Sequence, residues 1–199
     1  MLGDGLQMAT ECGHITRVIS FSFDEVKATQ AAAHLTALEG GNINYMKLIK
    51  LLYLADRNAI TQRGNPIVGG HYVSMKNGPV LSRVLDIIKP GGVVAAYWKQ
   101  HIDEAHNYHV RLKGPPPTGD LSEREIEWLD KVYSVYGSLD EWQLVEFTHL
   151  LPEWKDPGKS VLPIRVEKIL ESAKASQEEI SAIEAETGAA NRMSEILKD

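Results

Sequence analysis

The stretch from Asn44 to Val80, NYMKLIKLLYLADRNAITQRGNPIVGGHYVSMKNGPV, decides the fold. Its first part has apolar side chains at the spacing of an amphipathic helix, about 3.6 residues per turn. This spacing predicts a helix with Asn44 as its N-cap and Gly64 as the residue that ends it. The residues predicted on its apolar face are Met46, Ile49, Leu52, Tyr53 and Ile60. We expect this helix to form the core of the protein.

Three residues depart from this simple amphipathic pattern. Asp56 lies on the apolar face, where a carboxylate is costly unless it has partners. We expect it to accept hydrogen bonds from backbone N–H groups of the following loop, or to pair with a basic residue; a role as general base is the alternative. Leu51 and Leu54 lie toward the polar side. They are either buried against a second layer of helices or part of an exposed apolar patch that binds protein.

The loop after this helix contains residues with special backbone geometry. Pro66 has a fixed φ and favours an extended residue before it. Gly69 and Gly70 allow a turn with positive φ. The alternation from His71 to Met75 predicts a short strand, with Ile67-Val68 as a candidate partner in a small hairpin.

A second corner follows at Asn77-Gly78, a dipeptide typical of turns. Pro79 suits the first turn of a helix, because that position needs no N–H donor. The sequence therefore predicts a helix from Val80 to Lys89.

The rest of the chain adds further helices and one more β element. Two capping boxes, Ser122-x-x-Glu125 and Ser138-x-x-Glu141, are typical of helix starts. Apart from the central helix and the helix from Val80 to Lys89, helices are predicted at Asp24–Leu38, Ser122–Tyr136, Leu139–Leu150 and Pro163–Lys174, and a β-hairpin at Trp98–Ile102 and Tyr108–Leu112. The predicted fold class is mainly α (α+β): a single helical domain of about six helices with one or two small β-hairpins.

Length and composition indicate one globular domain with appendages. We predict an N-terminal extension over residues 1–20, a helical domain over 21–172 and a charged C-terminal tail over 173–199, which is helical or stays disordered until bound. The net charge of −6 and the pI of about 5.7 argue against an electrostatic nucleic-acid binder and suit a basic protein partner.

The cysteine content and the lengths of the apolar runs indicate the cellular compartment of the protein. Cys12 is the single cysteine, so no internal disulfide and no cysteine-based zinc site can form. The N-terminus lacks the pattern of a signal peptide, and no apolar run reaches the roughly 18 residues of a membrane span. We expect a cytoplasmic protein with no membrane contact.

Motifs for catalysis or cofactor binding are missing from the sequence. It has no Walker A motif, no Gly-x-Gly-x-x-Gly, no Gly-x-Ser-x-Gly and no His-Glu-x-x-His. Several possible metal ligands lie close together, but a hairpin would divide them between strands and turn: His101, Asp103, Glu104, His106 and His109. We therefore expect no metal and no cofactor. The remaining catalytic hypothesis is an acid–base pair of Asp56 with His149.

The order of several motifs resembles one known family. KLLYLADR (Lys50–Arg57), GNPIVGGHYVSM (Gly64–Met75) and GPV (Gly78–Val80) are followed by LSEREIEWLDKVYSVYG (Leu121–Gly137), by Thr148-His149 and by Trp154. This order is similar to that of the SocA-like antitoxins with a Panacea domain, found in bacteria and bacteriophages. The resemblance covers roughly residues 20–165 and implies a mostly helical domain with a small β element.

The resemblance implies an antitoxin of a type II toxin–antitoxin system, which neutralises a cognate protein toxin by direct binding. The toxin would be encoded by an adjacent gene. Residues expected to contact it are Leu51, Leu54, Arg57, His71, Tyr72, His149 and Trp154. Residues expected to maintain the motif are Asp56, Pro66, Gly69, Gly78 and Pro79. The alternatives are an adaptor that delivers a toxin to a protease, an enzyme using Asp56 and His149, and a DNA-binding autoregulator.

Overall fold

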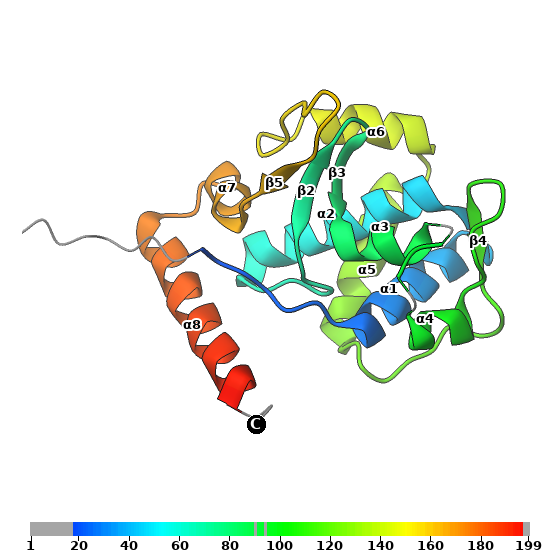
Figure 1. Ribbon diagram of the computed structural model, residues 1–199, viewed down its shortest axis with the longest axis horizontal. Helices are drawn as coiled ribbons and strands as arrows, with labels where there is room; N and C mark the ends of the chain where they lie inside the picture. Colours follow the sequence, from blue (N-terminus) through cyan, green and yellow to red (C-terminus); the bar gives the residue numbers. More distant parts are fainter. Residues whose placement is uncertain (1–17, 90, 94, 197–199) are drawn as a thin grey trace, which may run out of the picture.

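The computed structural model describes residues 18–89, 91–93 and 95–196 (Figure 1). The helices in this part are α1 (Glu25–Leu38), α2 (Tyr45–Arg63), α3 (Ser82–Ile88), α4 (Ala96–His101), α5 (Glu123–Tyr136), α6 (Glu141–His149), α7 (Val166–Ser172) and α8 (Gln177–Ile196). The strands are β1 (Asn42–Asn44), β2 (Tyr72–Met75), β3 (Gly78–Leu81), β4 (His109–Arg111) and β5 (Leu162–Ile164). The predicted mainly α (α+β) fold is confirmed, with eight helices in the described residues instead of six.

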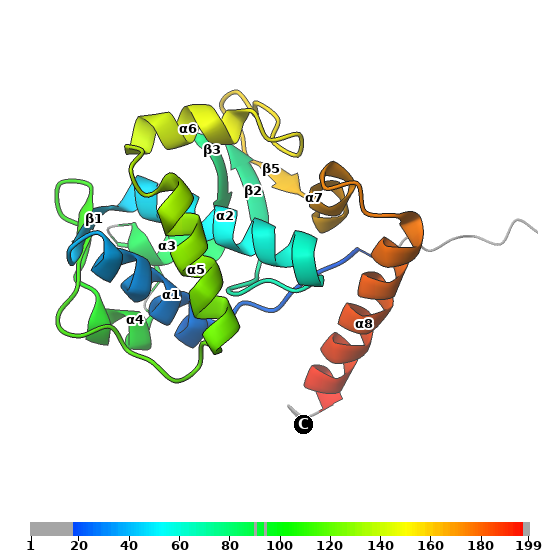
Figure 2. The same cartoon turned by 180° about the vertical axis from the view of Figure 1, so that it is seen from behind.

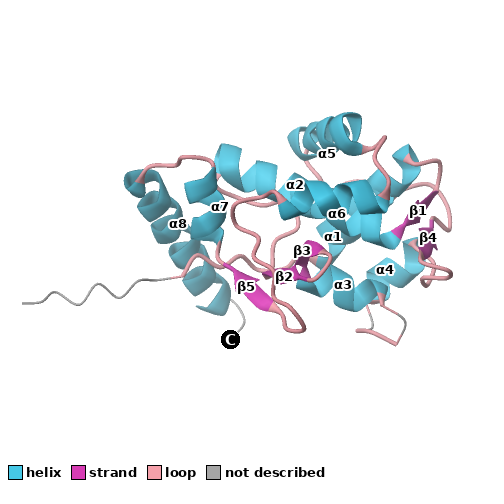
Figure 3. Ribbon diagram, turned by 90° about the horizontal axis from the view of Figure 1, so that it is seen from above, coloured by secondary structure: helices cyan, strands magenta, loops and turns pink. Residues whose placement is uncertain are grey.

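Helix α2 is the centre of the fold, as predicted. The side chain of Asn44 accepts a hydrogen bond from the N–H of Met46, and Gly64 ends the helix with a φ of 77°. Helices α1, α5, α6 and α7 and strand β3 pack against α2. Figure 2 shows α5 crossing one side of it, and Figure 3 shows β2 and β3 on the opposite side. Because α2 is covered on several sides, most of its residues are buried.

The three-stranded antiparallel sheet, in the order β3-β2-β5, differs from the predicted hairpin. Strand β2 pairs with β3 and β5, whereas Ile67 and Val68 form no strand because their N–H groups bond to Asp56. Pro79 lies within β3 and not in a helix. It is tolerated there because β3 is an edge strand, where a missing N–H costs no ladder bond. Helix α3 accordingly starts later than predicted.

Residues 96–112 correct a second prediction. The expected strand at Trp98–Ile102 is helix α4, and the buried Trp98 side chain belongs to the core. Strand β4 pairs instead with β1, with Val110 opposite Ile43. The partner strand directly precedes α2 but lies about 70 positions from β4 in the sequence, so no local pattern could reveal this pairing.

Three helix starts were predicted with different success. The Ser122–Glu125 capping box is present. The box predicted at Ser138 is wrong: Asp140 is the N-cap of α6, and the Gln143 side chain completes the box. The predicted helix start at Pro163 is also wrong, because this residue belongs to β5, opposite Val73.

The C-terminal tail forms α8, which runs through Gly188 without a break. It lies at one end of the molecule beside the segment that leads into α1 (Figure 1). Asn191 donates a hydrogen bond to the backbone oxygen of Ser20, and Ile183 lies beside Gly64. Most of the predicted N-terminal extension, including Cys12, lies outside the described residues. No helix in the described ranges is long and apolar enough to cross a membrane.

Candidate functional site

Asp56 holds the loop that follows α2. Its carboxylate accepts hydrogen bonds from the N–H groups of Ile67, Val68 and Gly69 and from the Tyr72 hydroxyl, at 2.8–2.9 Å. Burial raises the pKa of Asp56 to about 6, while these four hydrogen bonds act in the opposite direction. The backbone hydrogen bonds expected from the sequence are thus present, and both carboxylate oxygens are already engaged.

The β2–β3 turn is held from the other side by α6 and the residues after it. His149 Nε2 lies 3.1 Å from the backbone oxygen of Lys76 and its ring stacks on Trp154, with the ring centroids 3.9 Å apart. The Trp154 indole N–H donates to the backbone oxygen of Met75 at 3.1 Å. His149 therefore supports this turn, and the hypothetical acid–base pair with Asp56 is not formed.

A buried lysine lies beneath the same turn. Lys50 Nζ donates a hydrogen bond to the backbone oxygen of Pro79 at 2.8 Å, and burial lowers the pKa of Lys50 to about 7. Gly78 has a φ of 93°, and a Cβ added there would lie 2.6 Å from Thr148 Oγ1 and 2.8 Å from Lys50 Nζ. The position therefore needs glycine for both its backbone conformation and the space.

Arg57 belongs to a partly buried network between α2, α7 and the loop after α6. Its Nε donates to Glu153 at 2.6 Å, and its guanidinium also donates to Ser172 Oγ at 2.8 Å. The Tyr53 hydroxyl donates to the same Glu153 carboxylate, and burial, followed by the Glu153 charge, raises the pKa of Tyr53 well above its usual value. The Arg57 side chain thus joins three parts of the domain.

Residues 48–155, more than half of the chain, match the family described as Antitoxin SocA-like, Panacea domain. This chain belongs to that family. The resemblance seen in the sequence is thereby confirmed. The match starts inside α2 and ends just after Trp154, so it includes the Asp56 loop and the β2–β3 turn. No solved structure matches the chain.

Three of the residues that the sequence predicted to contact a partner are buried in the structure. Leu51 and Leu54 are buried, so the exposed apolar patch proposed for them is wrong and the alternative of a second helical layer holds. Helices α5 and α6 are among the elements that pack against α2. Tyr72 is buried too, where it donates to Asp56. These three side chains are not available to a partner.

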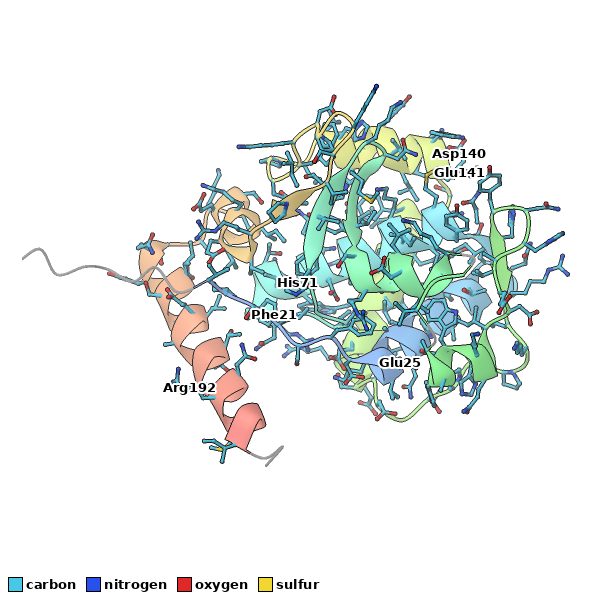
Figure 4. All side chains as sticks on the ribbon, in the orientation of Figure 1. Phe21, Glu25, His71, Asp140, Glu141 and Arg192 are labelled. Atoms are coloured by element: carbon cyan, nitrogen blue, oxygen red, sulfur yellow. The ribbon has the colours of Figure 1, made fainter. Side chains whose placement is uncertain are left out.

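His71 is exposed but lies away from α6. Figure 4 shows it near Phe21, across the domain from Asp140 and Glu141. The backbone of the preceding Gly69 approaches the segment that contains Phe21. His149 contacts Lys76 beyond the end of β2, whereas His71 precedes its start, so the two histidines lie at opposite ends of this strand.

Two exposed apolar residues, Trp142 on α6 and Leu150 directly after it, were not among the predicted partner contacts. The Trp142 side chain is 59% exposed and Leu150 is 80% exposed. A helical wheel of this segment places them, with Glu146, opposite the buried Leu144 and Thr148, so the signal was present in the sequence. Exposed large apolar side chains on one helix face are typical of protein-binding surfaces.

The histidine-rich segment before and after Asp103 is not arranged as a metal site. In the part of the chain that the structure describes, no three His, Cys, Asp or Glu side chains are grouped to hold a metal ion. The carboxylates of Asp103 and Glu104 form exposed ion pairs with Lys113 and Lys99 instead, at 3.7 and 3.6 Å.

Proposed function

We propose that this protein is the antitoxin of a type II toxin–antitoxin system and neutralises a cognate protein toxin by direct binding. The observation that carries the proposal is the Panacea-domain match over residues 48–155. The net charge of −6 is compatible with a basic toxin. The four donors that occupy the Asp56 carboxylate, and its separation from His149, favour binding over acid–base catalysis.

The surface we assign to the toxin includes the outer face of α6 and the residue after it, Leu150. Trp142 and Leu150 offer large exposed apolar area there. Tryptophan is among the residue types that most often dominate binding energy at protein interfaces. The neighbouring His149 and Trp154 stack and hold the turn rigid, which reduces the entropy lost on binding.

A growth assay tests the function. Each neighbouring open reading frame is expressed alone and together with this chain, and we expect one of them to arrest growth alone and to be rescued by co-expression. The rescued toxin should co-purify with this chain as a stoichiometric complex. Absence of both rescue and complex would overturn the proposal.

A pair of variants tests the assigned surface. Trp142→Ser should weaken the toxin complex by about tenfold or more, the usual effect of losing a dominant contact. Val135→Ser is the control, because Val135 is 57% exposed on α5 and lies outside the assigned surface. If the two variants bind the toxin with equal affinity, α6 is not part of the interface.

The lifetime of the toxin distinguishes masking from delivery to a protease. Masking predicts a toxin that is equally stable or longer-lived in the presence of this chain, whereas an adaptor predicts faster loss. A retarded band with the promoter of its own operon would instead indicate a DNA-binding autoregulator.

A further inference from the structure

A pocket of about 260 Å³ opens beside the β2–β3 turn, and neither His149 nor Trp154 lines it. It lies between the N-terminal half of α2, the turn and α3. Apolar side chains make most of its wall: Tyr45, Met46, Ile49, Met75, Val80 and Leu85. Its polar side chains are Lys50, Lys76, Asn77 and Lys89.

The charge of this pocket is opposite to that of the whole molecule. Three lysines line it and no Asp or Glu does, although the chain has 27 acidic residues against 21 Lys and Arg. Within the described residues none of these lysines forms an ion pair, whereas cations elsewhere in the domain, such as Lys27, Arg57 and Arg63, are paired with carboxylates.

Lys50 makes the pocket chemically specific. Its side chain is buried, and the backbone oxygen of Pro79 is its one acceptor among the described residues. An ammonium group has three N–H donors, and a buried charge is costly without compensation. Lys76 and Lys89, in contrast, are exposed at the rim. An anion at the pocket would therefore be attracted by the charges of Lys76 and Lys89 and would meet the N–H donors of Lys50 between them.

We propose that this pocket receives an acidic, apolar peptide segment of the toxin, with an apolar side chain in the pocket and flanking carboxylates at Lys76 and Lys89. This inference rests on the proposed function. The apolar walls distinguish such a peptide from a bare phosphate, which would gain nothing from them. A nucleic acid does not fit, because the chain has a net charge of −6. A toxin that is basic overall needs only one local acidic segment to fill the pocket.

Methionine methyl groups provide a probe that does not require the toxin. Met46 and Met75 line the pocket, and Met193 on α8 is an internal control. The protein with ¹³C-methyl methionine is titrated with a capped peptide in which two glutamates flank leucine and phenylalanine. We expect the Met46 and Met75 signals to shift and the Met193 signal to stay unchanged. A matched peptide with lysines in place of the glutamates should cause no shift.

Absence of a shift with the acidic peptide, or equal shifts with both peptides, would overturn the inference. The Lys76→Glu/Lys89→Glu variant should lose the response. The control variant, Lys131→Glu/Lys159→Glu, has the same change in net charge on exposed lysines outside the pocket and should keep it.

The toxin identified by the growth assay gives a second, separate readout. The pocket variant should bind it about tenfold or more weakly than the control variant, because like charges at an interface are unfavourable. If both variants bind the toxin equally and rescue growth, the pocket inference fails while the antitoxin function stands. If the wild-type chain neither binds nor rescues, the proposed function itself fails.

Discussion

Asp56 is the residue whose environment best explains the order of helix, loop and strand from α2 to β2. A single buried carboxylate accepts from three consecutive N–H groups and from one hydroxyl, so it sets the path of the loop from Ile67 to Gly69 and the position of Tyr72. Without that acceptor, four buried donors would lack a partner, which is costly in a low-dielectric interior.

Asp56→Asn should therefore destabilise the domain. The amide offers one acceptor oxygen, and its NH₂ group would face donors, so we expect the free energy of unfolding at pH 7.5 to fall by about 3 kcal/mol. Asp103→Asn, at an exposed ion pair, should change it by less than about 0.5 kcal/mol. Urea unfolding measures both. If Asp56→Asn leaves the stability unchanged but abolishes an activity, the carboxylate is catalytic.

Lys50 should make stability depend on pH. Its pKa is about 7 in the folded protein against a usual value of 10.5, so between these values the unfolded chain binds more protons. The free energy of unfolding should then rise with pH from 7 toward 10, by up to about 1.4 kcal/mol per pH unit. Lys50→Met should flatten this rise, and the exposed Lys131→Met should not. Parallel curves for all three proteins from pH 7 to 9.5 would contradict this account.

At the level of elements, Glu125 connects three helices. Its carboxylate pairs with Lys27 of α1 and Arg63 of α2 and accepts from the Ser122 N–H at the start of α5. Burial acts to raise the pKa of Glu125, but the hydrogen bonds from Ser122, Arg63 and Lys27 outweigh it and lower the pKa to about 2. The same carboxylate thus completes the capping box of α5 and joins α5 to α1 and α2.

Glu125→Gln should lower the free energy of unfolding by about 3 kcal/mol at pH 7. A depressed carboxyl pKa stabilises the fold above the usual pKa of 4.5, and this contribution is lost as the pH falls toward 2. The difference from wild type should therefore shrink between pH 4.5 and 3. Glu104→Gln, with a side chain that is 85% exposed, is the control and should have little effect. If the difference in the free energy of unfolding between Glu125→Gln and wild type stays constant across this pH range, the lost stability comes from packing and not from charge.

At the level of the whole molecule, α8 lies at one end of the described chain. It is anchored by the buried Ile180, by the contact of Ile183 with Gly64 and by Asn191 on Ser20. It lies outside the segment that matches the Panacea domain. Ile180 belongs to the hydrophobic core and Ile183 packs against it, so α8 contributes two side chains to a core that the other helices provide in larger part.

Removal of residues 176–199 should leave a folded domain. We expect one cooperative unfolding transition, with the free energy of unfolding lower by about 3 kcal/mol for the two isoleucine contacts. Circular dichroism and urea unfolding of the full and shortened chains provide the measurement. Loss of cooperative unfolding would mean that α8 is part of the core, and unchanged toxin binding would exclude it from the interface.

Local sequence patterns determined several features without the structure. The bounds of α2, with Asn44 and Gly64 at its ends, the capping box at Ser122 and the bonds of Asp56 to the following loop were all predictable. Each of them depends on residues within one helix or within a helix and the loop that follows it. The caps, the helical spacing and the nearest backbone donors are therefore encoded in a short window of sequence.

The tertiary structure alone decided the rest. Pro79 is a strand residue because β3 is an edge, and Trp98 is helical and buried although its segment looked like a strand. Lys50 and Thr148 meet at Gly78 from helices far apart in the sequence, and Leu51 is buried because other helices cover it. These outcomes depend on contacts between distant segments, and the burial and pairing energies of such contacts outweigh local preferences of a few tenths to about 1 kcal/mol per residue.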